Sequence, residues 1–322
     1  MYPVQLDTGS SDLCALFHAS KYSVLTPLSL LGIKGEVSPL PNTEQTVCLS
    51  IQVLTAILTT SQSVSYNLSY GVGWAYGNVG FGTVEFSGWV PPLYLDAITH
   101  GCFRIQIENQ SFLDVSDANN PALGYGAQGL IGLGFTSLSN IDYAINRTGS
   151  SSGRSFLFNA FSVDSQEPNF ISFVLSRSSD DQDELSGAMT IGEYVQGYEQ
   201  IEQTPAISTW PIKNPARWNV LLEAIHVGTK PTTVTSKVPN APANRAVALL
   251  DTGTSYTYAP PEVCQAIYGG IPGATYDPNS QLWLLPCNQE VDVALQIKYV
   301  RDRKRTTTPN KFAANVSFQC TP

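Results

Sequence analysis

Two stretches of this chain repeat one pattern: Val4–Ser11 reads VQLDTGSS, and Ala248–Ser255 reads ALLDTGTS. Each is an apolar run followed by Asp-Thr-Gly and then two hydroxyl residues. At average residue frequencies, a chain of this length contains about 0.1 copies of Asp-Thr-Gly by chance. A single copy is typical of a strand end followed by an Asx or glycine turn. Two copies with matching flanks indicate a duplicated functional element.

The residue types in this element suit acid–base chemistry. An apolar strand carries Asp7 or Asp251 to the interior, and Gly9 or Gly253 lets the backbone turn sharply behind it. If the two loops meet, both carboxylates cannot ionise cheaply, so one keeps a proton while the other acts as a base. A water held between them can be deprotonated by one Asp while the other protonates the carbonyl oxygen that is attacked. The proton belongs to the pair, so neither carboxyl is assigned a fixed role.

With these motifs the chain resembles the pepsin-like aspartic endopeptidases, of the fungal secreted type. The resemblance places Asp7 and Asp251 on the two catalytic positions. It further implies that the dyad is supported by the residues that follow each aspartate. In one loop these are Thr8, Gly9 and Ser10, and in the other they are Thr252, Gly253 and Thr254. The threonines would bond across between the loops, and Ser10 and Thr254 would stand behind the carboxylates.

A third stretch resembles the flap, the hairpin that closes over the substrate in this family. Alternating residues and a Gly-rich tip between Gln62 and Ser87 predict a hairpin from the sequence pattern alone. The resemblance puts Tyr70 at the flap tyrosine and makes Gly71 and Val72 substrate-binding residues. A fourth stretch, Gly129–Phe135 (GLIGLGF), resembles the apolar-apolar-Gly strand that braces the first Asp loop.

The implied fold is all-β, with two lobes and an active-site cleft between them. The polar run Arg177–Ser186 marks the expected lobe boundary, giving an N-terminal lobe of residues 1–185 and an incomplete C-terminal lobe of residues 186–322. Helices are expected at Ser137–Asn146, capped by Ser139 or Asn140, at Ser155–Phe161 and at Pro260–Gly269. Strands are expected at 169–175, 188–192, 210–212, 218–227, 282–285 and 291–297, and the remainder, Val300–Pro322, is expected to be a solvated tail without strand alternation.

Several features depart from the family pattern. Only six residues precede Asp7, with no signal peptide among them, and no second apolar-apolar-Gly strand follows Asp251, so the chain is read as truncated at both ends. Cys14 stands where the resemblance leads us to expect a Trp that supports the flap tyrosine, which would leave Tyr70 less well positioned. Residues 15–33 and 89–104 match nothing expected, which favours either translated non-coding sequence or lineage-specific loops.

Composition excludes other classes of function. Acidic residues outnumber basic ones, 26 to 17, and a net charge of -9 argues against nucleic-acid binding. No apolar run reaches the length of about 18 residues that a spanning helix needs. Three scattered histidines, His18, His100 and His226, offer neither a Ser-His-Asp triad nor a zinc site. No metal and no cofactor is therefore expected.

The resemblance implies a monomeric aspartic endopeptidase that hydrolyses polypeptides at acidic pH and is secreted or vacuolar. Four Asn-x-Ser/Thr sequons agree with a secreted glycoprotein, beginning at Asn67, Asn109, Asn146 and Asn315. A disulfide from Cys287 to either Cys264 or Cys320 fits the same setting, and the sequence does not choose between them. The alternative is a catalytically inactive pepsin-like protein, or defective gene product, that at most binds peptides. An unrelated β-sandwich adhesion module would leave the paired Asp motifs unexplained.

Overall fold

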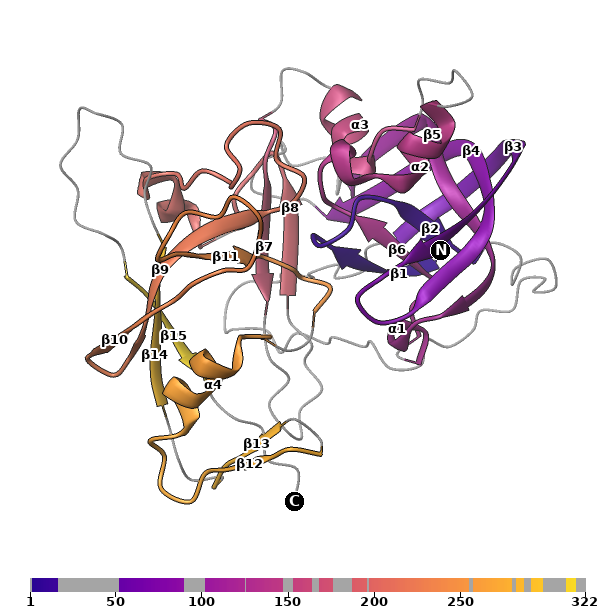
Figure 1. Cartoon of the computed structure of the whole chain (residues 1–322). Helices are drawn as coiled ribbons and strands as arrows, with labels where there is room; N and C mark the ends of the chain where they lie inside the picture. The colour runs from indigo at the N-terminus through magenta and orange to yellow at the C-terminus, as the bar shows by residue number, and fades with distance from the viewer. Residues whose placement is uncertain are drawn as a thin grey trace, which may run out of the picture. The chain divides into compact units, whose positions relative to one another are not determined.

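The computed structural model describes residues 2–16, 52–89, 102–124, 126–146, 153–163, 168–175, 187–195, 197–254, 257–279, 282–286, 291–297 and 311–316. The chain divides into two compact units, Met1–Thr204 and Pro205–Pro322. Strands dominate both units, which confirms the predicted all-β class (Figure 1). None of the described helices has the length and apolar run that a bilayer crossing needs.

The first unit is built on a ring of six strands. In spatial order these are β1 (Tyr2–Asp7), β3 (Gln52–Ser69), β4 (Trp74–Trp89), β5 (Cys102–Asn119), β2 (Leu13–Ala15) and β6 (Gly129–Gly132), and β6 closes the ring by pairing with β1. The β1–β6 pair is parallel, whereas β6 and β2 run antiparallel. The parallel pairing with β6 continues to Asp7, whereas β3 pairs with β1 only at Tyr2 and Pro3, so the first Asp motif is held by β6.

The predicted hairpin is present and is longer than its sequence pattern suggested. β3 and β4 pair from Gln52 with Ser87 up to Ser69 with Trp74, with three register shifts on the way. The turn is closed by the Tyr70 backbone N–H, which donates to the Gly73 carbonyl over 3.0 Å. Gly73 has a φ of +91°, a conformation that glycine adopts without steric cost. The hairpin prediction is therefore confirmed, with Tyr70 at the start of the turn.

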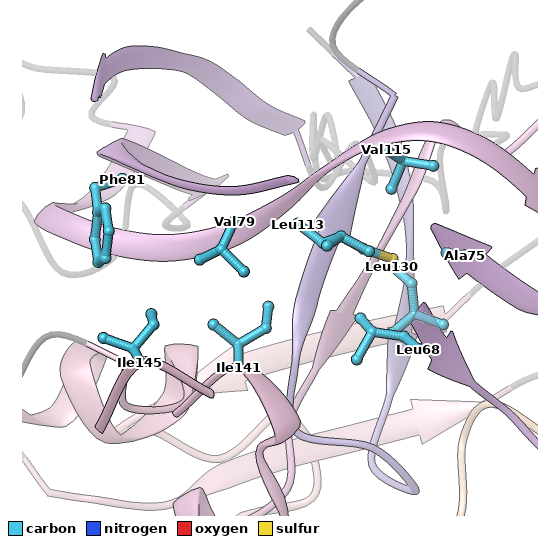
Figure 2. Close-up of a cluster of buried hydrophobic side chains, with 10 residues drawn as sticks. Leu68, Ala75, Val79, Phe81, Leu113, Val115, Leu130, Ile141 and Ile145 are labelled. Atoms are coloured by element: carbon cyan, nitrogen blue, oxygen red, sulfur yellow. The ribbon is translucent and has the colours of Figure 1, made fainter. Parts of the chain in front are cut away.

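Side chains from β2, β3, β4, β5 and β6 meet one helix in the core of this unit. The helix is α2 (Asn140–Asn146), and its Ile141 and Ile145 are 1% and 0% exposed. Figure 2 shows both isoleucines pointing toward Val79 and Phe81 of β4. The remaining buried members of this cluster are Cys14, Leu68, Ala75, Leu113, Val115 and Leu130. The strand alternation and the helical spacing of 141 and 145 thus bury one continuous apolar surface.

Short helices complete the first unit. These are α1 (Pro121–Gly124), η3 (Thr136–Leu138), α2, α3 (Phe156–Val163) and η4 (Glu199–Gln203). Of the two capping residues that the sequence offered for α2, the structure uses Ser139, whose Oγ accepts the N–H of Asp142 over 2.9 Å. The helix predicted at Ser155–Phe161 is present as α3.

The division between the units falls at 204/205, whereas the sequence placed it at 185/186. The reason is the antiparallel pair of β7 (Ile171–Leu175) and β8 (Gly187–Ile191), which runs from Ile171 opposite Ile191 to Leu175 opposite Gly187. This pairing joins residues on either side of the polar run. The polar composition of that run therefore does not mark the end of the first compact unit.

The second unit contains an open sheet. β9 (Asn219–Val227) lies between β10 (Lys230–Thr233) and β14 (Val291–Ile297), β14 also pairs with β15 (Lys311–Val316), and β11 (Ala246–Leu249) pairs with β9. A separate pair is formed by β12 (Thr275–Asp277) and β13 (Leu282–Leu284). Helix α4 (Pro261–Tyr268) begins with Pro261, as its sequence predicted. Its buried Val263 joins an apolar cluster with Leu222, Ile225, Val234 and Val293.

Two predictions for the second unit are wrong. Val300–Pro322 is not wholly a tail, because Lys311–Val316 forms β15 and pairs residue by residue with β14 from Gln296 to Val291. The basic run at the start of this stretch favoured the prediction of a tail, although a short strand follows it. Trp210–Ile212 is not a strand but a series of bends, in which the Trp210 N–H donates to the Asn219 carbonyl over 2.9 Å.

Two further expectations concern cysteines and unusual segments. Cys264 is a free thiol, so the pairing of Cys264 with Cys287 is wrong in this structure. The other possible pairing, Cys287 with Cys320, lies outside the described residues. Most of residues 15–33 and most of residues 89–104 also lie outside them. At the ends of those segments, Ala15 belongs to β2, Trp89 to β4 and residues 102–104 to β5.

The packing of the first unit predicts a large effect at its centre. Leu113 is fully buried in the cluster, and truncation to Ala removes that burial and leaves a cavity. We expect Leu113→Ala to lower the free energy of unfolding by about 2–5 kcal/mol. Leu175→Ala is the control, because Leu175 is 71% exposed, and its free energy of unfolding is expected to change by no more than about 0.5 kcal/mol. Urea unfolding followed by circular dichroism checks this, and equal losses in the two variants would contradict the assigned core.

Candidate active site

Asp7 ends strand β1 and is held from the side by β6. The parallel register sets Asp7 opposite Gly132, and the Leu133 N–H donates to the Asp7 carbonyl over 2.7 Å. The Asp7 side chain is buried, with 7% of the residue exposed. Val4, Gln5 and Leu6 before it are half-buried, and the strand ends with the aspartate in the interior, as the sequence motif predicted.

The carboxylate of Asp7 is oriented by its own loop. The Gly9 backbone N–H donates to Oδ1 over 2.8 Å, closing an Asx turn. Thr8 is buried and Gly9 is half-buried. The hydroxyl of Ser10 is buried and has no hydrogen-bond partner among the described residues. Of the three residues predicted to support Asp7, Gly9 donates a hydrogen bond to its carboxylate, and the supporting roles of Thr8 and Ser10 stay predictions.

Two glycines of the Gly129–Phe135 stretch allow this loop to lie against β6. The Gly132 N–H donates to the Asp12 carbonyl over 2.9 Å, and the Gly134 N–H donates to the Ser10 carbonyl over 2.8 Å. A Cβ at Gly132 would lie 2.5 Å from the Asp12 nitrogen, and one at Gly134 would lie 2.5 Å from the Ser11 Oγ. Glycine is required because any side chain would push the loop away. The predicted bracing strand is confirmed.

Asp251 follows β11 in the second unit and has the same local geometry. The Gly253 backbone N–H donates to Asp251 Oδ1 over 2.8 Å, and the Thr254 hydroxyl donates to Oδ2 over 2.6 Å. Thr252 is half-buried, as is Asp251 itself. β11 pairs with β9, and the Leu250 N–H donates to the Trp218 carbonyl over 3.0 Å. Within the described part of the second unit, no parallel strand pairs with β11 in the way that β6 pairs with β1.

The turn of the β3–β4 hairpin carries the third predicted group. Gly71 and Val72 are exposed, Val72 by 63%, and the Asn120 side-chain amide contacts the Val72 carbonyl over 3.5 Å. Tyr70 is half-buried, and its hydroxyl lies 3.2 Å from the Cys14 Sγ. Cys14, where a Trp was expected, thus contacts the predicted flap tyrosine directly. A thiol and a phenol can each donate in such a pair.

An apolar cavity of about 30 Å³ adjoins this thiol–phenol pair. Its walls include Cys14, Tyr70, Ala75, Val115, Ala118 and Leu130. The small side chains at 14, 75 and 118 leave this space unfilled beside the Tyr70 ring. A second apolar hollow, of about 310 Å³, lies in the second unit beside the Asp251 loop and is lined by Ile207, Thr209, Trp218, Val220, Leu250 and Ile297.

Burial keeps the Cys14 thiol and the Tyr70 phenol neutral. It raises the pKa of the Cys14 thiol to about 11, and it raises the pKa of the Tyr70 phenol, with the neighbouring Cys14 adding to that rise. Burial also raises the pKa of the Asp12 carboxyl, although hydrogen bonds from Ser139, Asn140 and Ile141 oppose it. At neutral and acidic pH, neither Cys14 nor Tyr70 therefore supplies charge for catalysis.

Sequence reasoning missed the contact between Asp12 and the start of α2. The Ser139 Oγ donates to Asp12 Oδ1 over 2.5 Å, although the two residues are 127 positions apart. The sequence held one sign of such a contact: Asp12 is a second acidic residue in an otherwise apolar and hydroxyl-rich motif. A carboxylate that is buried there requires hydrogen-bond donors. What the sequence could not supply was the identity of those donors.

Comparison with known proteins agrees with this geometry. The family described as eukaryotic aspartyl protease matches residues 1–321, and the chain belongs to that family. It is 24% identical over 242 residues to an aspartic protease of Phaffia rhodozyma, covering 73% of this chain and 48% of that protein. It is 26% identical over 217 residues to the aspartic-type endopeptidase ctsD of Aspergillus fumigatus, covering 67% of this chain and 39% of that protein. The chain thus aligns with less than half the length of either relative.

The raised pKa of Cys14 predicts slow alkylation in the native protein. A pKa of about 11 in place of 9.0 lowers the thiolate fraction at pH 8 about 100-fold. We expect iodoacetamide to label the partly exposed Cys264 well before Cys14, and the Cys14 rate to rise about tenfold per pH unit below its pKa. Peptide mass spectrometry measures both rates, with the protein in concentrated guanidinium chloride as control. Equal native rates would contradict the burial of Cys14.

Proposed function

We propose that this protein is an aspartic endopeptidase in which Asp7 and Asp251 form the catalytic pair. The observation that carries the proposal is the repeated geometry of the two motifs. In each, a strand ends at the aspartate or two residues before it, and the glycine two residues after the aspartate donates its N–H to Oδ1 over 2.8 Å. Two separate units of one chain thus present a carboxylate in the same orientation relative to its own loop.

The proposed reaction needs one proton on the pair. Two facing carboxyls share a proton because ionising both places like charges together, as is known for aspartic proteases in general. The ionised carboxylate takes a proton from water while the oxygen of that water forms a bond to the peptide carbonyl carbon. The protonated carboxyl gives its proton to the carbonyl oxygen. The tetrahedral intermediate then collapses as the C–N bond breaks: the protonated carboxyl gives its proton to the leaving nitrogen, and the ionised carboxylate takes a proton from one hydroxyl of the intermediate, which leaves one proton on the pair.

The residues around each aspartate are proposed to have different roles, some in holding the carboxylates and others in binding the substrate. Thr254 and Gly253 donate to both oxygens of Asp251, which fixes the plane of that carboxylate. Thr8 and Thr252 would bond across between the loops, and Ser10 would stand behind Asp7. Tyr70, Gly71 and Val72 would lie over an extended polypeptide, whose backbone pairs with the hairpin edge in the manner of an added strand.

The proposed substrate is a polypeptide with apolar residues beside the bond that is cut, since apolar space lies near Tyr70 and beside the Asp251 loop. The enzyme is proposed to act as a monomer in an acidic secreted or vacuolar setting. Sedimentation at assay concentration tests the monomer, and detection of the chain in culture medium or vacuoles tests the location. A dimer or a cytosolic signal would overturn these two points.

The decisive test is digestion of an unfolded protein at acidic pH. Asp7→Asn and Asp251→Asn remove one carboxyl each and are expected to lower kcat by about 10²–10⁴-fold or more. Asp277→Asn is the matched control, because Asp277 Oδ1 accepts the Asn279 N–H over 3.0 Å in a comparable turn outside the two motifs. It is expected to keep full activity. Cleavage that survives both motif substitutions would refute the dyad.

The competing function is peptide binding without cleavage. Cys14 in place of the expected Trp, with unfilled space beside Tyr70, is the observation that favours it. A folded wild-type chain that binds an extended apolar peptide but never cuts it would establish this alternative. Cleavage that depends on both Asp7 and Asp251 would exclude it.

A further inference from the structure

Asp12 is a buried carboxyl that the proposed reaction does not use. It lies in the same loop as Asp7, and only 5% of the residue is exposed. A carboxylate taken out of water at this depth is costly unless donors replace the lost hydration. The hydrogen-bond donors to Asp12 therefore identify the part of the fold that holds the loop.

Among the described residues, the hydrogen bonds to the Asp12 side chain all come from one place, the start of helix α2. Oδ1 accepts the Ser139 hydroxyl over 2.5 Å and the Ile141 backbone N–H over 3.1 Å. Oδ2 accepts the Asn140 backbone N–H over 3.0 Å and the Asn140 side-chain amide over 3.2 Å. Asp12 thus binds two backbone and two side-chain donors at once.

These contacts complete the helix terminus. The first N–H groups of a helix have no partner inside the helix. Ser139 satisfies the N–H of Asp142, and Asp12 satisfies those of Asn140 and Ile141. The carboxylate cannot move away without leaving buried donors unpaired, which fixes its position relative to α2.

Helix α2 is itself anchored in the core. Ile141 and Ile145 pack against Val79 and Phe81 of the hairpin strand β4 (Figure 2). On its other side the Asp7 loop is bonded to β6 and the two residues after it, through the carbonyls of Asp7, Ser10 and Asp12. Backbone bonds to β6 and the Asp12 side chain on α2 therefore hold the loop from two directions.

We propose that Asp12 is a positioning residue for catalysis at Asp7, because its carboxyl fastens the Asp7 loop to the first turn of α2. The inference rests on the proposed function, since it assigns Asp12 a part in placing Asp7. Asp12 acts through the loop and does not contact substrate. A displacement of about 1 Å in a catalytic group can cost about 10²-fold in rate.

Three variants separate positioning from ordinary stabilisation. Asp12→Asn keeps one acceptor oxygen but turns the other into an amide that faces the donors of Asn140. Adding Asn140→Asp supplies an acceptor for that amide and restores the side-chain pair. Ile145→Val removes one methylene from the buried face of the same helix and is the control for loss of helix stability.

The first measurement is steady-state proteolysis at a temperature where all variants are folded by circular dichroism. We expect Asp12→Asn to lower kcat by about 10- to 100-fold with KM changed by less than about twofold. The double variant should regain most of this loss, and Ile145→Val should keep the wild-type kcat. An Asp12→Asn kcat equal to that of Ile145→Val would overturn the inference.

The second measurement does not depend on activity. Hydrogen exchange read by mass spectrometry on peptides covering residues 5–13 and 129–135 follows the loop and its bonds to β6. Faster exchange in Asp12→Asn than in Ile145→Val is expected, and equal exchange would overturn the inference. A folded wild type that cleaves nothing refutes the proposed function, and the exchange result then decides alone whether Asp12 holds the loop.

Discussion

The parallel pairing of β1 with β6 is the constraint on which the first unit depends. It closes the six-stranded ring, and it also sets the backbone of Asp7 opposite Gly132. Because a single residue's slip in register would turn every side chain to the other face, the same bonds that complete the sheet fix where the Asp7 carboxylate points. Gly132 and Gly134 permit the pairing by leaving the loop room to approach. Fold and candidate site therefore rest on the same few backbone contacts.

The parts that sequence predicted are the parts whose cause is local. The Asx turns at Asp7 and Asp251 follow from Asp-Thr-Gly, and the turn after Tyr70 follows from a glycine that accepts a positive φ. Alternation over a few residues predicted the hairpin, and helical periodicity predicted a cap of α2 at Ser139 or Asn140, of which the structure uses Ser139. In each case the residues that make the structure lie within one turn or within one hairpin.

The parts that sequence missed depend on partners far along the chain. Lys311–Val316 is a strand because β14 offers it a matching edge, and its own composition gave little sign of this. The pairing of β7 with β8 likewise joins residues on either side of the polar run Arg177–Ser186, and the composition of that run gave no sign of it. Asp12 and Ser139, and Cys14 and Tyr70, are joined across 127 and 56 positions. A single sequence contains both members of such a pair but not the fact that they meet.

The two sheets also differ in how far their edge strands are open to pairing with another chain. The strands of the first unit close into a ring, although among the described residues most of β3 pairs with β4 alone, whereas the sheet of the second unit runs from β10 to β15. β10 reads Lys-Pro-Thr-Thr, and at the edge of a sheet a proline lacks the N–H that a new strand would need while a lysine brings a charge. This edge is thereby protected against uncontrolled strand addition. In a protein proposed to take extended polypeptides as substrates, such protection keeps unfolded chains from joining the sheet where no cleavage follows.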